Sequence, residues 1–344
     1  MTDLVPQLAA RVSAAMADNT PLYIHGGNSK RDAIGRDCTA EHSLDVSGHR
    51  GISDYQPEEL VVSARAGTPI RELEAVLAQQ GQMLPFEPPH YDGRATLGGT
   101  LASNLSGPAR PWLGSIRDSV LGVQLINGRG QILAFGGKVM KNVAGYDVSR
   151  LQAGALGTLG IISEVHLKVL PQPEATLTLA REATAQDALK LMTQYAGQPK
   201  PLTAASWIEG RLYLRLAGAA SAVNHTARIW GGENIDNAFW NQLRDMSHEF
   251  FAKPAPLWRL SITPTAPCSD NLDQCIDWGG AQRWLRTPPT QVPPGAHLSL
   301  FSGGDRQAEV KGDLDAVQKQ LQLRLKQSFD PAGILNPGRL YSWM

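Results

Sequence analysis

The stretch from Phe135 to Leu170 restricts the possible folds of this chain more than any other segment. Gly136 and Gly137 lie near its start, and four more glycines lie between residues 145 and 160. Glycine has no Cβ and readily adopts positive φ, so a backbone rich in it can approach a flat or phosphorylated ligand closely. From Ile161 to Leu170 apolar and polar residues alternate, which predicts a strand that attaches this loop to a core. Together the two features predict a nucleotide cofactor held largely by main-chain atoms.

The composition indicates a folded protein without a strongly charged surface. The chain has 344 residues, of which 42% are hydrophobic and 19% charged, so it can bury a sizeable core in two domains. Its formal net charge of zero argues against nucleic acid as a partner, because nucleic acid selects a basic surface. No apolar run resembles a signal peptide or a membrane span. We therefore expect a cytoplasmic protein, and peripheral attachment to the inner membrane through partner subunits stays open.

The cysteines give no sign of a metal centre. The three of them, Cys38, Cys268 and Cys275, form neither a C-x-x-C pair nor the ligand spacing of a zinc or iron–sulfur site. Free thiols in a reducing compartment are the expected state. We accordingly expect no metal site in this chain.

Periodicity in the first 172 residues predicts alternating helices and strands. Leu4, Leu8, Val12 and Met16 recur at every fourth residue and predict the buried face of a helix over residues 1–18. The other expected elements are strands at 22–24, 60–62 and 161–170, a helix from Thr68-Pro69 to Gly81, and a hairpin of 121–126 with 131–135 about the turn Asn127-Gly128. Pro171 and Pro173 end the pattern, and we place a domain boundary after residue 172.

Residues 173–324 have a different pattern, which predicts a smaller α+β domain. The expected helices are 185–195, 219–229, 236–250 and 306–327, and the expected strands are 176–180, 204–208, 211–217, 257–263 and 297–301. The last segment, residues 325–344, is rich in turn residues, and we expect it to return to the first domain.

Two glycine-rich stretches could hold a phosphate. The common motifs G-x-G-x-x-G after a strand and G-x-x-x-x-G-K-[ST] are both absent, so any phosphate must be held in another way. The turn at 25–30 follows a strand and can direct several N–H groups at a pyrophosphate, with an ordinary hairpin loop as the alternative. Hydroxyls and glycine amides alternate over residues 96–104, which suits a ribityl chain and a phosphate, with a packed glycine turn as the alternative.

Two later stretches carry charged side chains. In residues 114–118, Arg117 and Asp118 either support a ligand or form an ordinary surface ion pair. Lys138 and Lys141 precede Asn142 and the turn at 145–147. A cation there would stabilise the negative charge of a reduced flavin, and solvated lysines are the alternative.

In combination and in order, these stretches closely resemble the FAD-binding fold of the vanillyl-alcohol oxidase / p-cresol methylhydroxylase (PCMH) superfamily. The matching motifs are the first glycine loop, T-L-G-G, G-S-x-R-D followed by V-L-G, K-N-V-x-G-Y-D, G-T-L-G-I-I-x-E-V and F-D-P-x-G-I-L-N-P-G-R, and they cover residues 20–172 and 325–341. Within that superfamily, 27–30 with 34–36, 81–91 and 277–285 look most like the FAD-binding subunits of bacterial glycolate oxidase.

The resemblance implies an α+β fold with a two-part FAD-binding domain of the PCMH type, residues 1–172 completed by 325–344. A smaller α+β cap domain, residues 173–324, would contact substrate or another subunit. The implied FAD contacts are Gly26, Gly27, Asn28, Ser29 and Lys30 at the pyrophosphate; Thr96, Leu97, Gly98, Gly99, Thr100, Ser103 and Asn104 along the ribityl–flavin segment; Ser115, Arg117 and Asp118 supporting the dinucleotide; Gly160, Ile161 and Ile162 at the adenine side; and Asn336 and Arg339 near the isoalloxazine.

Catalytic residues are harder to assign. Some superfamily members link the flavin to a histidine of the first loop, but His25 stands where related chains often carry a non-linking residue, so we expect non-covalent FAD. Oxidation of a 2-hydroxy acid needs a base, a cation for the carboxylate and the flavin N5 to take hydride. The sequence shows no persuasive base-plus-cation pair, and His90, Tyr91, Lys141 and His297 are the candidates for catalytic roles.

The resemblance implies an FAD-dependent oxidoreductase subunit of a complex that oxidises glycolate to the 2-oxo acid with a non-nicotinamide electron acceptor, and D-lactate is the second candidate substrate. The implied partners are a larger FAD-containing catalytic subunit and an iron–sulfur subunit, with the main substrate site on the larger one. Two alternatives stay open: a self-sufficient FAD-dependent 2-hydroxy-acid dehydrogenase, and a flavin-containing assembly subunit without its own substrate site.

Overall fold

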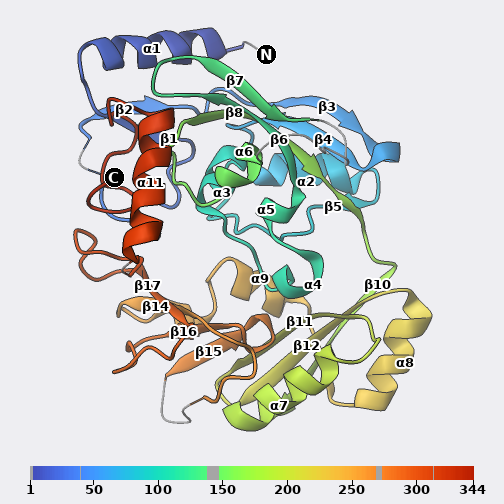
Figure 1. Cartoon of the computed structure of the whole chain (residues 1–344). Helices are drawn as coiled ribbons and strands as arrows, with labels where there is room; N and C mark the ends of the chain where they lie inside the picture. The colour runs from blue at the N-terminus through green and yellow to red at the C-terminus, as the bar shows by residue number, and fades with distance from the viewer. Residues whose placement is uncertain (1–2, 39, 138–146, 269–272, 313) are drawn as a thin grey trace. The chain divides into compact units, whose positions relative to one another are not determined.

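Two units, each with its own sheet and hydrophobic core, account for the residues that the structure describes (Figure 1). The computed structural model describes residues 3–38, 40–137, 147–268, 273–312 and 314–344. Unit 1 comprises 1–105, 115–171 and 305–344, and unit 2 comprises 106–114 and 172–304. Residues 305–324 belong to unit 1, whereas the sequence-based limits place them in the cap domain. Residues 106–114 belong to unit 2, whereas those limits place them in the FAD-binding domain.

Unit 1 is built around a five-stranded antiparallel sheet. Its order is β3 (Ile52–Gln56), β4 (Val61–Arg65), β8 (Ile161–Lys168), β6 (Val120–Ile126) and β7 (Ile132–Gly136). The predicted alternation is confirmed in β8, where Val165 and Leu167 are buried. They pack in one core with Leu73 and Leu77 of α2 (Ile70–Ala78) and with Leu101 of α3 (Leu97–Ser103).

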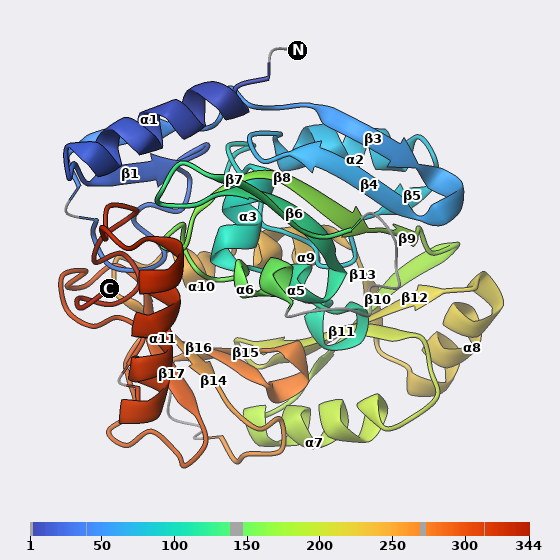
Figure 2. The ribbon, with the colours of Figure 1, turned by 45° about the horizontal axis from the view of Figure 1, so that its top comes forward.

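A second layer of unit 1 joins the two ends of the chain. Strand β1 (Leu22–His25) pairs in parallel with β2 (His42–Asp45), and Leu22 also forms a parallel bridge with Leu335. Helix α1 (Val5–Ala17) covers this layer, as Figure 2 shows, with Val12 in a core that includes Leu44. The remaining elements of unit 1 are η1 (Pro57–Glu59), β5 (Gln82–Met83) paired with β9 (Leu170–Pro171), α5 (Ile116–Ser119), α6 (Val148–Leu151) and α11 (Ala316–Phe329).

Unit 2 contains an eight-stranded antiparallel sheet. Its order is β13 (Glu233–Ile235), β10 (Ala175–Glu182), β12 (Arg211–Gly218), β11 (Leu202–Ile208), β15 (Gln274–Asp277), β16 (Gln282–Leu285), β14 (Leu257–Ser261) and β17 (His297–Ser302). Alternate leucines of β12 face a core that includes Met192 of α7 (Ala185–Ala196) and Val223 of α8 (Ala220–Trp230). The short elements α4 (Arg110–Leu113), α9 (Ala238–Arg244), α10 (Glu249–Ala252) and η2 (Trp278–Gly280) complete the unit.

Several predicted elements have different limits in the structure. The helix predicted at 236–250 is divided into α9 and α10, because Met246 between them has φ 55° and cannot continue a right-handed helix. The helix predicted at 306–327 begins at residue 316, where the Asp315 carboxylate accepts a hydrogen bond from the Gln318 N–H. Strands β2, β3, β13, β15 and β16 were not predicted, since segments of three to five residues carry little periodicity.

Two smaller predictions about unit 1 were wrong. Met16 is 37% exposed, because the buried face of α1 passes through Ala15 instead. The β6–β7 hairpin exists, but its left-handed residue is Gly130, not a residue of the pair Asn127-Gly128. The Asn127 side chain instead accepts hydrogen bonds from the N–H groups of Arg129 and Gln131, each at 3.0 Å, which closes the longer loop.

A buried ion pair anchors the C-terminal segment inside unit 1. The Lys326 ammonium donates to the Asp330 carboxylate at 2.7 Å and to the carbonyl oxygens of Thr158 and Leu335. Asp330 in turn accepts hydrogen bonds from the N–H groups of Ile334 and Leu335. Because every donor of the ammonium has an acceptor, this pair ties α11 to the segment that runs beside β1.

We expect Lys326→Met to lower the free energy of unfolding by about 3–5 kcal/mol, because it leaves the Asp330 carboxylate buried without its counter-ion. Chemical denaturation of the purified protein measures this change. The matched control is Lys190→Met, which removes an exposed helical lysine from its 3.0 Å pair with Asp187 and should change the stability little. Equal effects of the two substitutions would contradict the structural role of the buried pair.

Candidate functional site

A pocket in unit 1 brings together most of the residues predicted to bind the cofactor. It contains about 770 Å³ of space, part of it open to solvent. Its predicted lining residues are Gly26, Gly27, Asn28, Ser29, Lys30, Thr96, Gly98, Gly99, Ser103, Gly160, Ile161, Ile162, Asn336 and Arg339. They come from segments that are far apart in the sequence, so the pocket exists only in the folded unit.

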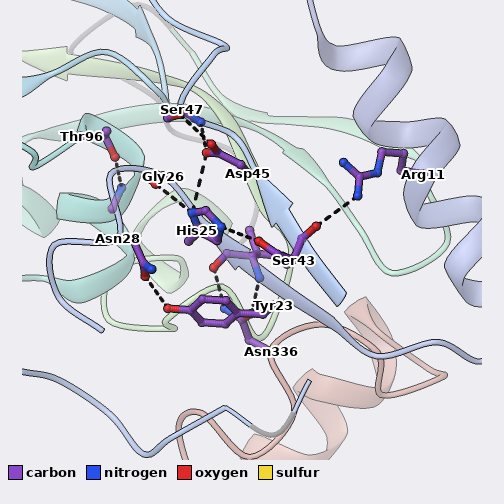
Figure 3. A network of polar contacts seen from close by, with 12 residues as sticks. Arg11, Tyr23, His25, Gly26, Asn28, Ser43, Asp45, Ser47, Thr96 and Asn336 are labelled. Atoms are coloured by element: carbon purple, nitrogen blue, oxygen red, sulfur yellow. Dashed lines mark hydrogen bonds and ion pairs between the residues drawn. The ribbon is translucent and has the colours of Figure 1, made fainter. Parts of the chain in front are cut away.

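The loop after β1 offers main-chain donors to this pocket. Among the described residues, the N–H groups of Gly27, Asn28, Ser29 and Lys30 have no hydrogen-bond acceptor. Asn28 has φ 51°, and its side-chain oxygen accepts a hydrogen bond from the Tyr23 hydroxyl at 2.6 Å, as Figure 3 shows. Successive free amides around a left-handed residue form a concave nest that binds anions.

Two glycines keep this loop close to its neighbours. A Cβ on Gly27 would overlap the main-chain carbonyl of Arg94, and a Cβ on Gly26 would lie 2.5 Å from the Thr96 hydroxyl oxygen. The Arg94 obstacle is backbone, so it cannot rotate away as a side chain could. The loop therefore requires glycine at position 27 to pass this close to the segment before α3.

The start of α3 provides surface to the pocket rather than donors. The Gly98 N–H donates to Ala66 O at 2.8 Å, and the Gly99 N–H donates to the Thr96 hydroxyl at 3.3 Å. Leu97 and Thr100, which the sequence analysis also assigned to the cofactor, are fully buried and do not line the pocket. What this segment contributes is a wall without Cβ atoms at Gly98 and Gly99.

Lys30 is a partly buried cation of the pocket loop. Its side chain is partly buried, and its ammonium nitrogen lies 5.2 Å from the centroid of the Tyr91 ring. Burial lowers the pKa of Lys30 to about 8, because the charged form loses hydration. An anion beside it would favour the charged form again, so this lysine is suited to an anionic ligand.

His25 has both ring nitrogens engaged within the protein. Nδ1 lies 2.9 Å from Gly26 O and 3.7 Å from the Asp45 carboxylate, and Nε2 lies 2.6 Å from the Ser43 hydroxyl (Figure 3). The ring also lies against Tyr23, with 5.4 Å between ring centroids. These contacts assign both nitrogens to holding β1 and β2 together.

Asn336 and Arg339 hold the pocket loop through main-chain carbonyls. The Asn336 side chain accepts from the Ile24 N–H at 2.6 Å and donates to Leu156 O at 2.7 Å. The Arg339 guanidinium donates to the carbonyls of Lys30, Arg31 and Arg36. Both side chains therefore position the walls of the pocket, and the flavin contact that the resemblance implied for them stays a prediction.

The other predicted cofactor residues lie outside the lining. Asn104 ends α3 with φ 50°. Its side-chain oxygen is buried and accepts no hydrogen bond from the described residues. Ser115 and Asp118 form a capping box at the start of α5, with the Asp118 carboxylate accepting from the Ser115 N–H at 2.8 Å. Arg117 is exposed in the same helix. Their contact with a cofactor stays a prediction.

Of the candidate catalytic residues, His90 and Tyr91 lie in unit 1 and His297 lies in unit 2. His90 is paired with the Glu74 carboxylate at 2.7 Å, and Tyr91, with φ 47°, contacts Lys30. His297 is exposed at the start of β17 in unit 2. Lys141 lies outside the described residues, as do Lys138, Asn142, Gly145 and Tyr146 of the same stretch.

Sequence reasoning missed several lining residues. They are Tyr23, Ile24, His25, Arg31, Val46, Ala66, Ala102, Leu156 and Gly157. Of these residues, Gly157 could have been predicted most easily, because it belongs to the glycine cluster of the sequence. In the structure it has φ 75°, and a Cβ on it would lie 2.7 Å from the Asn336 amide nitrogen. The apolar ones carried no signal, because a leucine that lines a pocket looks like one that fills a core.

The described residues lack two other kinds of functional feature. No group of three or more histidine, cysteine, aspartate or glutamate side chains in the described ranges could hold a metal ion. Within the same ranges, no helix combines the length and the apolar character that crossing a membrane would require.

Comparison with known proteins identifies similar chains. A family model described as an FAD binding domain matches residues 5–136. Glycolate oxidase subunit GlcE of Escherichia coli (strain K12) is 45% identical over 99% of this chain and 98% of its own length. Glycolate oxidase subunit GlcD of Bacillus subtilis (strain 168) is 34% identical, over 37% of this chain and 27% of its own. D-lactate dehydrogenase of Anaerostipes hadrus is also 34% identical, over 37% of this chain and 26% of its own length.

A solved structure supports the fold. Alkyldihydroxyacetonephosphate synthase superposes with a TM-score of 0.66 over 96% of this chain and 74% of that one, at 16% identity. The predicted α+β fold with a PCMH-type FAD-binding domain is thereby confirmed, and FAD is the cofactor that the family model indicates.

We expect Gly27→Ala to reduce the flavin content of the purified protein at least tenfold, because the new Cβ displaces the loop from the Arg94 carbonyl. Flavin absorbance per folded protein, with folding checked by circular dichroism, measures this. The control is Gly48→Ala, where the Cβ would meet Leu4 at an ordinary 3.4 Å and the flavin should stay bound. If Gly27→Ala folds and retains full flavin, this loop does not bind the cofactor.

Proposed function

Because the chain belongs to the family of FAD-binding oxidoreductases that includes glycolate oxidase subunit GlcE, we propose that it holds FAD in a glycolate oxidase complex. In this complex glycolate would be oxidised to its 2-oxo acid, and the electrons would pass to a non-nicotinamide acceptor. The observation that carries the proposal is the near-complete match to the glycolate oxidase subunit, 45% over 99% of the chain. The pocket of unit 1 supports it, because the free N–H groups of residues 27–30 can donate to the pyrophosphate of FAD.

The proposed FAD site uses the free amides of the loop after β1. The N–H groups of residues 27–30 would face the pyrophosphate, and Lys30 would add a positive charge beside it. Gly98, Gly99, Gly157 and Gly160 line the same pocket and let a flat or extended ligand approach the backbone. When bound, the flavin supplies a two-electron acceptor for the hydride of a 2-hydroxy acid.

We propose that FAD is bound without a covalent link. A covalent attachment at His25 would require a ring nitrogen that faces the flavin with no other partner. Both nitrogens of His25 instead lie within 3 Å of protein oxygens, those of Gly26 and Ser43. Release of unmodified FAD on denaturation, with no flavin adduct in the mass spectrum of the chain, is the result expected.

Flavin affinity should decrease as the pH rises through about 8. In the flavin-free pocket Lys30 has a pKa of about 8, so it is charged below that pH and neutral above it. The dianionic pyrophosphate binds the charged form, and hence the association constant should fall by up to about tenfold between pH 7 and pH 9. Fluorescence titration with FAD measures this dependence.

Lys30→Met should remove that pH dependence and lower the affinity at pH 7 to the value that the wild type has at high pH. The control Lys190→Met, at an exposed position of unit 2, should keep the wild-type profile. A pH profile that survives Lys30→Met would exclude Lys30 as the group that titrates.

The proposed assembly contains a larger FAD-containing subunit and an iron–sulfur subunit. The match to a protein named as a subunit supports a complex. Unit 2 would act as the cap domain that contacts substrate or a neighbouring subunit. Attachment of the complex to the inner membrane would then occur through those partners.

The test of the proposed function compares the chain alone with the chain in its complex. Each sample is loaded with FAD, made anaerobic and mixed with glycolate, and the flavin absorbance is recorded. Loss of the absorbance in the complex supports the proposal. Loss in the chain alone would instead show a self-sufficient dehydrogenase, and an absence of bound flavin in both samples would refute the FAD site itself.

A further inference from the structure

Trp278 of unit 2 is held on a strained turn. It has φ 54°, and Gly279 and Gly280 after it have φ 64° and 103°, so three successive residues adopt conformations that favour glycine. Such strain in a bulky residue is concentrated at functional sites, where surrounding contacts maintain it. Here the Trp278 indole N–H donates to Gly107 O at 3.0 Å, and a Cβ on Gly280 would lie 2.6 Å from Pro264 O.

Two guanidinium groups lie against the indole of Trp278. The guanidinium carbon of Arg110 lies 4.5 Å from the ring centroid, and that of Arg259 lies 5.0 Å from it. Each contact is a cation–π interaction, but it brings two like charges to one ring. The two guanidinium groups therefore repel each other unless an anion lies close to both of them.

The two arginines retain unused donors. Arg259 donates from Nε to the Gln282 side chain at 2.6 Å, and among the described residues its two terminal nitrogens have no acceptor. Arg110 is exposed, and within the described ranges its guanidinium forms no hydrogen bond or ion pair. The two free terminal nitrogens of Arg259 can donate side by side to the two oxygens of a carboxylate.

Burial makes the charge of Arg259 costly. Loss of hydration and the charge of Arg110 lower the pKa of Arg259 to about 10, and the charge of Asp277 acts in the opposite direction. Asp277 is itself buried and accepts a weak hydrogen bond from Gln282 at 3.5 Å. Two cations against one carboxylate leave a net positive charge, so one further anion would neutralise the cluster.

We propose that Arg110, Trp278 and Arg259 form a binding site for the carboxylate of a small organic acid. That the acid is the 2-hydroxy acid substrate or its 2-oxo product rests on the proposed function. Oxidation of a 2-hydroxy acid needs a cation for the substrate carboxylate, and the sequence alone did not reveal one. This site supplies it.

The test measures binding, not turnover. The full chain is loaded with FAD and titrated anaerobically with glycolate, and with glycolamide as its uncharged analogue, by calorimetry and by tryptophan fluorescence. Glycolate should bind and change the fluorescence, whereas glycolamide should bind at least tenfold more weakly, because it lacks the charge that the guanidiniums recognise. Equal binding of the two compounds would overturn the proposal.

Variants then locate the site. Arg259→Gln should weaken glycolate binding about tenfold or more, and Arg110→Gln should weaken it severalfold, since Arg110 is more exposed to solvent. The control Arg228→Gln removes an exposed arginine of α8 in the same unit and should leave binding unchanged. Unchanged binding in Arg259→Gln, or no glycolate binding by wild type that carries FAD, would overturn the site.

The flavin absorbance of the same samples separates the two proposals. A yellow protein that does not bind glycolate refutes the carboxylate site and leaves the proposed FAD site intact. A colourless protein refutes the FAD site, and glycolate binding by that protein would still support the arginine pair.

Discussion

The pocket of unit 1 depends on one constraint: the polar main-chain groups on the open side of β1 need partners that its own sheet does not supply. Segment 330–339 supplies them. The Asn336 side chain binds the Ile24 N–H, the Leu22 N–H donates to Ile334 O at 2.7 Å, and Arg339 binds the carbonyls at the end of the pocket loop. Because unpaired buried polar groups are costly, this pairing holds the loop in one conformation.

That pairing also explains why the loop can receive an anion. Arg339 holds the carbonyls of Lys30 and Arg31 at the end of the loop, and the N–H groups of residues 27–30 have no acceptor among the described residues. Arg339 thus positions the backbone of the loop that we propose to contact the pyrophosphate. Burial of Lys30 then adds a cation whose protonation depends on what occupies the site.

Much of the fold could be predicted because long elements carry clear periodicity, as in β8 and α1. Short strands such as β15 and β16 could not, and their antiparallel pairing is what places Gln282 and Arg283 opposite Asp277 and Ile276. The motifs correctly indicated the pocket loop, but spacing does not say which donors are already used. Gly98 and Gly99 looked like phosphate ligands, yet their amides are bonded within the protein. The arginine pair escaped detection because Arg110 and Arg259 lie far apart in the chain and meet only at Trp278.

The bond between Ile24 and Asn336 joins residues 312 positions apart. At ribosomal speeds of about 5–20 residues per second, the first wall of the pocket waits roughly 15–60 s for the second. Until then the loop of residues 27–30 lacks its bonds to segment 330–339, and the pocket of the nascent polypeptide is incomplete. Binding of FAD at the proposed site would consequently be a late event in biogenesis, and an incompletely translated product that lacks Asn336 and Arg339 would lack two of the side chains that hold the pocket walls.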